Sequence, residues 1–189
     1  MVGYVQGKPI ALSLDEFLAL PETEPASEYI DGEVIQKEMP KGKHSLLQIE
    51  LGAQINAVSK PNRIALALPE LRCTFDNCLI VPDIAVFTWN RIPFTDSGEI
   101  PDDFLLAPDW MIEILSSEQS PIKPINKILH ALKHGMRLGW LLAPDDRSVL
   151  TFLPDQAPNV VEGDSLLPVL PEIPLELTAD AVFDWLVIN

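Results

Sequence analysis

The sequence has few cysteines and no long apolar run, and each scarcity excludes a class of protein. Cys73 and Cys78 are its two cysteines, and they lack the four clustered Cys or His ligands of a structural zinc site. No stretch approaches the roughly 18 consecutive apolar residues of a membrane span, and the N-terminus lacks the pattern of a signal peptide. We therefore expect a cytoplasmic protein with no membrane association. We expect both cysteines to be reduced, with a disulfide across a tight hairpin as the alternative.

Basic residues are also scarce, because 13 Lys and Arg stand against 28 Asp and Glu and give a net charge of −15. Such a chain repels nucleic acid at long range, so a nucleic-acid function needs a local basic patch, a bound metal or a partner chain. Hydrophobic residues make up 47%, which is enough for one sizeable core. With no repeat or linker, we expect a single domain over residues 1–189, in which residues 1–12 form an N-terminal extension.

The order of apolar periods and breaker residues predicts strands that alternate with two main helices, hence an α/β (α+β) fold with a mixed central sheet flanked by helices. Ser13 and Glu16 form a capping box, Asp31-Gly32 and Asp76-Asn77 mark tight turns, and Thr178 caps a last helix. The expected elements are a helix to Leu20, a hairpin within 26–40, a helix over 43–60, strands at 63–75, 78–88 and 110–115, a helix over 122–136, a strand at 139–144, a hairpin within 149–163 and a C-terminal helix.

Two carboxylates stand alone in apolar strand patterns. Residues 79–87 are apolar on both faces except for Asp83, and residues 110–115 repeat the pattern with Glu113. A buried, unpaired carboxylate is costly or takes up a proton. A shared Mg²⁺ explains both, since this ion is typically held by one or two carboxylates; the alternative is a private cation or amide for each. We favour the shared metal and expect the two carboxylates to lie close together on neighbouring strands.

A histidine opens the helix predicted over 43–60. His44, Leu47, Leu51 and Ile55 share one helical face, so we expect His44 to point toward the core, either as a site residue or as a structural histidine. Residues 39–43 hold two lysines and a glycine at the helix N-terminus, where free amides favour a phosphate; an ordinary solvated loop is the alternative.

In order and spacing, these residues resemble the Uma-type restriction endonucleases of the PD-(D/E)XK nuclease superfamily. The likeness covers roughly residues 13–185. The motifs that carry it are Pro82-Asp83, Glu113-Ile114-Leu115-Ser116, Lys127 in the following helix, the hairpin Glu28-Tyr29-Ile30-Asp31-Gly32-Glu33, His44 in the first core helix, and Gly139-Trp140-Leu141-Leu142-Ala143-Pro144.

The resemblance implies a restriction-endonuclease-like fold and a Mg²⁺ site, with Mn²⁺ as a substitute, that hydrolyses phosphodiester bonds of DNA. Asp83 and Glu113 would be the metal ligands, with the Ile114 carbonyl as a further candidate. Glu28 would be an accessory acidic residue. Lys127 would be the catalytic lysine that assists the attacking water, moved from the usual strand position, here Leu115, to the next helix.

Lys127 lies off the centre of the apolar stripe of its helix, so a solvated lysine is the alternative. We expect Lys127 at the edge of the site, where it contributes little to folding, and we expect no other lysine or arginine in a comparable place. The family's acidic residue and tyrosine around the lysine are replaced by Asn126 and Ala131. These departures and the net charge favour a second hypothesis, a nuclease-fold protein without catalysis that acts as a binding or scaffold module.

Apolar residues at 92–94 and in the tail, with Phe183 and Trp185, are expected to be exposed. We therefore expect the chain to self-associate, and nucleases that cut both strands often act as twofold homodimers.

Overall fold

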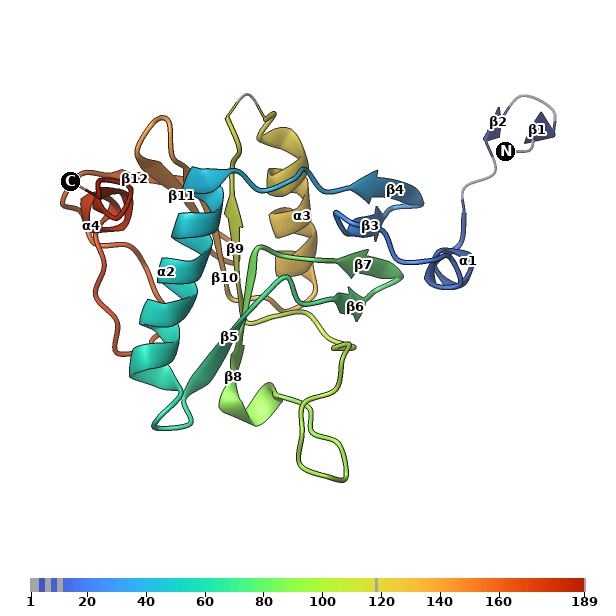
Figure 1. The fold of residues 1–189 in the computed structure, drawn as a ribbon, viewed down its shortest axis with the longest axis horizontal. Coiled ribbons are helices and arrows are strands. Elements are labelled where there is room, and N and C mark those ends of the chain that lie inside the picture. The colour runs from blue at the N-terminus through green and yellow to red at the C-terminus, as the bar shows by residue number, and fades with distance from the viewer. Residues whose placement is uncertain (1–3, 6–7, 10–11, 118, 189) are drawn as a thin grey trace.

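The computed structural model describes residues 4–5, 8–9, 12–117 and 119–188 (Figure 1). Its helices are α1 (Leu14–Leu18), α2 (Gly42–Ser59), α3 (Ile122–Lys133) and α4 (Ala179–Asp184), with the 3-10 turn η1 (Trp89–Arg91). Its strands are β1 (Tyr4–Val5), β2 (Lys8–Pro9), β3 (Ser27–Ile30), β4 (Glu33–Gln36), β5 (Ala65–Pro69), β6 (Cys73–Phe75), β7 (Cys78–Ile80), β8 (Ile84–Thr88), β9 (Trp110–Ile114), β10 (Leu138–Ala143), β11 (Ser148–Phe152) and β12 (Asn159–Glu162).

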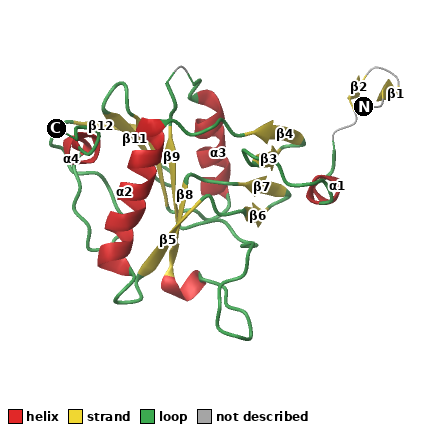
Figure 2. Cartoon of the chain, in the orientation of Figure 1, coloured by secondary structure: helices red, strands yellow, loops and turns green. Residues whose placement is uncertain are grey.

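A mixed sheet forms the centre of the described chain, in the strand order β12-β11-β10-β9-β8-β5. β9 and β10 are parallel, and the other neighbouring strands are antiparallel. The chain between β9 and β10 contains α3, as a parallel connection requires a long crossover. Helix α2 lies against one face of this sheet and α3 against the other (Figure 2). The predicted mixed sheet flanked by helices is confirmed.

A second sheet, in the order β4-β3-β7-β6, lies beside the central one, and the sequence did not predict it (Figure 1). The strands expected at 63–75 and 78–88 each divide into two strands that belong to different sheets. Pro82 lacks an amide hydrogen for a sheet ladder, and it lies where the chain leaves β7 and enters β8. Asp83 therefore lies at the junction of the two sheets and not within a strand, which corrects its expected position.

Alternation along the central strands divides the core into two clusters. Trp110 and Ile112 of β9 pack on the side of α2, whereas Met111 packs on the other side with Ile128 of α3. Glu113 follows the period of Met111, so the strand pattern directs it to the α3 side. Both faces are buried, as the apolar runs predicted.

The predicted local signals are confirmed where the chain turns or starts a helix. Ser13 and Glu16 form the capping box of α1, and the Thr178 side chain accepts a hydrogen bond from the Ala181 amide in α4. Asp76 and Asn77 both have positive φ angles, 45° and 55°, as a tight hairpin turn with right-handed twist requires.

The expectation that Phe183 and Trp185 are exposed is wrong, because the first is buried and the second is partly buried, although Val187 and Ile188 at the end of the tail are exposed. Phe183 and Ile92 are buried, because Phe183 packs in the core cluster around α2 and Ile92 packs in the cluster around α3. Phe94 is exposed. Self-association stays a prediction without the support of the tail. Cys73 and Cys78 are both free, and no helix in the described part of the chain is long and apolar enough to cross a membrane.

Candidate active site

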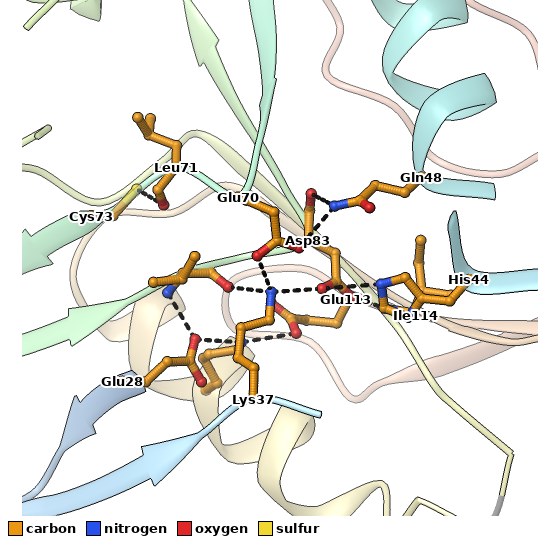
Figure 3. A network of polar contacts seen from close by, with 12 residues as sticks. Glu28, Lys37, His44, Gln48, Glu70, Leu71, Cys73, Asp83, Glu113 and Ile114 are labelled. Atoms are coloured by element: carbon orange, nitrogen blue, oxygen red, sulfur yellow. Dashed lines mark hydrogen bonds and ion pairs between the residues drawn. The ribbon is translucent and has the colours of Figure 1, made fainter. Parts of the chain in front are cut away.

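Asp83 is held from three directions at the junction of the two sheets. Its Oδ2 accepts a hydrogen bond of 2.7 Å from the Ile114 amide of β9. Its Oδ1 lies 2.8 Å from Lys37 Nζ and 3.4 Å from His44 Nε2 (Figure 3). Because β8 and β9 pair with Ile84 opposite Ile112, the register continues to place residue 83 beside residue 113. The carboxylate thus has a fixed position next to Glu113.

The surroundings of Asp83 favour its ionised form. Burial alone raises the pKa of the carboxyl, but the hydrogen bond from His44 and the charges of Lys37 and Lys127 outweigh burial and hold the pKa well below its usual range. Asp83 is 2% exposed, so this charge persists in a place that water hardly reaches. It is therefore an anion at neutral pH, immediately before β8.

Glu113 and Glu28 share one ammonium group. Lys127 Nζ lies 2.9 Å from Glu113 Oε2 and 2.8 Å from Glu28 Oε1. Glu28 Oε1 also accepts a hydrogen bond of 2.7 Å from the Val81 amide, which precedes Asp83 by two residues. Glu28 therefore connects the lysine of α3 to the backbone that carries Asp83.

Lys127 is 4% exposed, so the expectation of a lysine at the edge of the site is corrected. Burial by itself lowers the pKa of Lys127, but the charges of Glu113 and Glu28 raise it by more than burial lowers it. The ammonium group therefore stays charged. Lys127 precedes the buried Ile128 on α3, and its side chain reaches the carboxylates of Glu28 and Glu113 instead of solvent.

Glu113 differs from Asp83 in its protonation. Burial, opposed by the charge of Lys127 and assisted by that of Asp83, raises the pKa of Glu113 to about 8. Its Oε1 is buried and has no hydrogen-bond partner among the described residues. A buried carboxylate oxygen without a hydrogen-bond partner is costly, so this atom favours binding a proton or a cation.

Lys37, which follows β4, was missed by the sequence reasoning. Its Nζ contacts Asp83 Oδ1, the Val81 carbonyl oxygen at 2.9 Å and Glu70 Oε2 at 2.7 Å (Figure 3). Gln48 of α2 donates to Glu70 Oε1 and to the Asp83 carbonyl oxygen. The expectation of no second cation is therefore wrong. The available signal was the position of Lys37 between a strand and the helix that carries His44.

The carboxylates open onto a cavity of about 440 Å³. Its walls come from the β3–β4 hairpin, the segment after β4, the end of β9 and the first turns of α3. Lys123 lines it beside Lys37 and Lys127. Lys43, from the expected phosphate cradle, instead makes an exposed ion pair with Asp145.

The matching family model, Uma2, is described as "Putative restriction endonuclease" and covers residues 14–182. The chain belongs to the Uma2 family. A solved structure described as a "putative nuclease belonging to DUF820", from Anabaena variabilis ATCC 29413, has 54% sequence identity and a TM-score of 0.90. The match covers 93% of this chain and 99% of that chain. No curated protein matches the chain.

Within this Uma2-family chain, the five residues singled out from the sequence fall in one region. They come from β3, α2, the β7–β8 junction, β9 and α3, and they are Glu28, His44, Asp83, Glu113 and Lys127. The donor atoms of His44, Glu70 and Asp83 lie within 4.8 Å of one another, so the first two are further candidate ligands for a cation at Asp83. The arrangement joins carboxylates with a buried ammonium in an open cavity, as cation-assisted hydrolysis of a phosphate ester needs.

Proposed function

We propose that this chain is a Mg²⁺-dependent endonuclease that hydrolyses phosphodiester bonds of DNA, with Asp83 and Glu113 as metal ligands. The observation that carries the proposal is the buried Oε1 of Glu113, which has no partner among the described residues, beside the ionised Asp83. The family and its nuclease neighbour support the hydrolytic class.

The donor set fits a hard divalent cation. Asp83 and Glu113 supply carboxylate oxygens, and Mg²⁺ is commonly held by one or two such groups together with water. Four carboxylates face two ammonium groups here, which are Glu28, Glu70, Asp83 and Glu113 against Lys37 and Lys127. The carboxylates of this cluster therefore outnumber its ammonium groups, and a bound cation would reduce the excess of negative charge. A bound cation would have to share Asp83 with Lys37 or displace its ammonium.

The side chains of this site have separate tasks. When bound, the metal would lower the pKa of a coordinated water and offset charge on the phosphate. Lys127 supplies a fixed positive charge beside Glu113, where charge that develops on a phosphate oxygen would be stabilised. Glu28 positions both Lys127 and the Val81 backbone, and His44 steadies Asp83. Each task follows from a contact of the metal-free protein.

DNA reaches this cavity against the net charge of −15. Lys37, Lys123 and Lys127 are the local cations of its wall. Because the acidic surface repels DNA at long range, we expect association to be weak without Mg²⁺ and to depend on the ion more strongly than in a basic nuclease.

The test is cleavage of supercoiled plasmid and of single-stranded DNA with Mg²⁺, Mn²⁺ or no divalent ion. We expect cleavage by the wild type, and a loss of at least about 10²-fold in Asp83→Asn and Glu113→Gln. Glu172→Gln removes an exposed carboxylate that pairs with Arg137 at the surface, and as the matched control it should cleave like the wild type. Equal cleavage by Asp83→Asn and the control would refute the proposal.

The alternative is a nuclease-fold scaffold, favoured by the contact of Lys37 with Asp83 in the place of a cation. Calorimetry with Mg²⁺ and Mn²⁺ separates the two. Metal binding that Asp83→Asn abolishes, without cleavage of any DNA tested, would support a scaffold with an intact metal site. Absence of both would support a scaffold whose site is closed by lysine.

A further inference from the structure

A second cluster of metal-ligating side chains lies outside the cavity. It joins Asp76, from the turn between β6 and β7, to His130 and His134 of the C-terminal half of α3. One donor atom from each lies within 4.8 Å of the other two. The two histidines are four residues apart, so they occupy the same face of the helix on consecutive turns. None of the three lines the cavity of the candidate active site.

The ring of His134 is oriented as a metal ligand would be. Its Nδ1 lies 2.8 Å from the backbone carbonyl oxygen of His130, which can only accept, so Nδ1 carries a hydrogen. Its Nε2 points at Asp76 Oδ2, 2.6 Å away. Histidines that bind metals usually donate their other ring N–H to a carbonyl or carboxylate in this way. The opposite nitrogen then faces the Asp76 carboxylate, and a cation bound here would take the place of the hydrogen that joins these two atoms.

His130 supplies an independent observation. Its Nε2 is buried and has no hydrogen-bond partner among the residues that the structure describes. The His130 and His134 ring centroids are 4.6 Å apart, and the Phe75 ring lies 5.8 Å from the first and 6.0 Å from the second. A buried imidazole nitrogen that has neither a water molecule nor a protein group to bind is energetically costly. A cation bound by this cluster would remove that cost.

The donor set distinguishes this cluster from the carboxylate site. Two imidazoles and one carboxylate suit Zn²⁺, with Co²⁺ and Ni²⁺ as substitutes, whereas Mg²⁺ prefers oxygen ligands and remains largely hydrated. We propose that Asp76, His130 and His134 form a second metal site, which binds Zn²⁺ and leaves one position for water.

The location of this metal site suggests a structural role. Lys127 lies one turn before His130 on α3, and β7 leads from the Asp76 turn through Val81 to Asp83. A Zn²⁺ ion would connect the two elements that deliver the ammonium and the carboxylate of the active site. It would therefore stabilise the arrangement of the cavity without taking part in the reaction.

Zn²⁺ and Co²⁺ titrations in excess Mg²⁺ test the site; this design rests on the proposed function, in which Mg²⁺ fills the carboxylate centre. We expect one Zn²⁺ per chain, visible d–d absorption of the Co²⁺ form, and a higher thermal unfolding temperature with Zn²⁺. His130→Ala and His134→Ala should each weaken Zn²⁺ binding by at least about 10-fold, since loss of even an outer-shell partner costs about 10–100-fold.

His44→Ala is the matched control, because His44 is the one other histidine of the sequence and contacts Asp83. It should retain the Zn²⁺ affinity and the Co²⁺ spectrum of the wild type. Circular dichroism of the metal-free variants establishes that they fold. Wild-type affinity in His130→Ala and His134→Ala, or a loss confined to His44→Ala, would overturn the proposal, whatever the outcome of the cleavage assay.

Discussion

Two buried carboxylate networks lie at opposite ends of β8, and they differ in how completely they are satisfied. At one end, Asp109 Oδ2 accepts hydrogen bonds of 2.8 Å from the Thr88 amide and from the Thr88 hydroxyl, and Oδ1 pairs with Arg91 at 2.7 Å. At the other end, Glu113 leaves one oxygen without a partner among the described residues. The first network is complete as it stands, whereas the second is complete only with a proton or a cation.

The two networks also differ in charge and in origin. Asp109 faces one guanidinium, and its partners Thr88 and Arg91 are three residues apart in sequence. The carboxylates around Glu113 outnumber the ammonium groups and come from elements spread along the chain. A local, neutral network fixes the fold, and we infer that the distant, unbalanced one serves a ligand.

The largest difference in stability should appear when the buried carboxylate of each network is replaced by the corresponding amide. Asp109→Asn removes the charge facing Arg91 and should cost about 3–5 kcal/mol, as the breaking of a buried pair does. Glu113→Gln resembles the protonated form and should cost little in the metal-free protein. Urea unfolding with a chelator measures both. Equal losses would show that the Glu113 network is as structural as that of Asp109.

The next effect concerns Lys127. Lys127→Met leaves Glu28 and Glu113 facing each other without their cation, so the variant should lose stability near the upper end of about 1–3 kcal/mol. This replaces the expectation that its removal leaves folding intact. The double variant Lys127→Met with Glu113→Gln should recover much of the loss while remaining unable to cleave. Unfolding free energies of the four proteins give the coupling, and no recovery would place the cost in packing instead.

A smaller effect should follow from the contact between α3 and the central sheet. A Cβ on Gly139 of β10 would lie 2.5 Å from Ile128 Cγ2, so Gly139→Ala should shift the helix that carries Lys127 and cost about 1 kcal/mol. Gly52→Ala on α2 meets no atom within 4 Å and should be neutral or slightly stabilising. Thermal unfolding and cleavage of both variants test this. If Gly139→Ala behaved like Gly52→Ala, the close approach would have no influence on the site.

Local signals of the fold were readable from the sequence. Ser13 and Thr178 acted as caps, Asp76-Asn77 acted as a turn, and the apolar runs became strands buried on both faces. The division into two sheets was not readable, since the pairing of β7 with β3 depends on contacts of residues about 50 positions apart, such as Tyr29 with Leu79. Pattern periodicity contains no such information.

The candidate site divides in the same way. Asp83 and Glu113 stood out because a lone charge in an apolar run needs an explanation. Lys37 and Glu70 did not, because each follows a strand as an ordinary charged residue, and only the tertiary fold brings them to Asp83. The second candidate metal site was not recognised for the same reason. The two histidines at the C-terminal end of α3, His130 and His134, suggest a metal site only when the distant turn brings Asp76 to them as a third ligand.

The last effect is a difference in pH profile between the two carboxylates of the open network. The pKa of Glu113 is raised to about 8 from an ordinary 4.5. A carboxyl whose pKa is higher in the folded than in the unfolded state stabilises the folded state. This contribution is fully present below the pKa of the unfolded state and is lost as the pH rises through about 8. Asp83 has a lowered pKa, so its contribution is present above its ordinary value and is lost only in acid. Without metal, the wild type should therefore lose stability relative to Glu113→Gln between about pH 5 and 8, whereas Glu172→Gln should follow the wild type.

Mg²⁺ needs the ionised carboxylate, so its binding near neutral pH should release a proton, detectable by calorimetry in buffers of different ionisation enthalpy. Glu113→Gln should release none from this position. A flat wild-type profile together with binding that releases no proton would mean that Glu113 is already ionised, and its open oxygen would then be held by water instead of a proton.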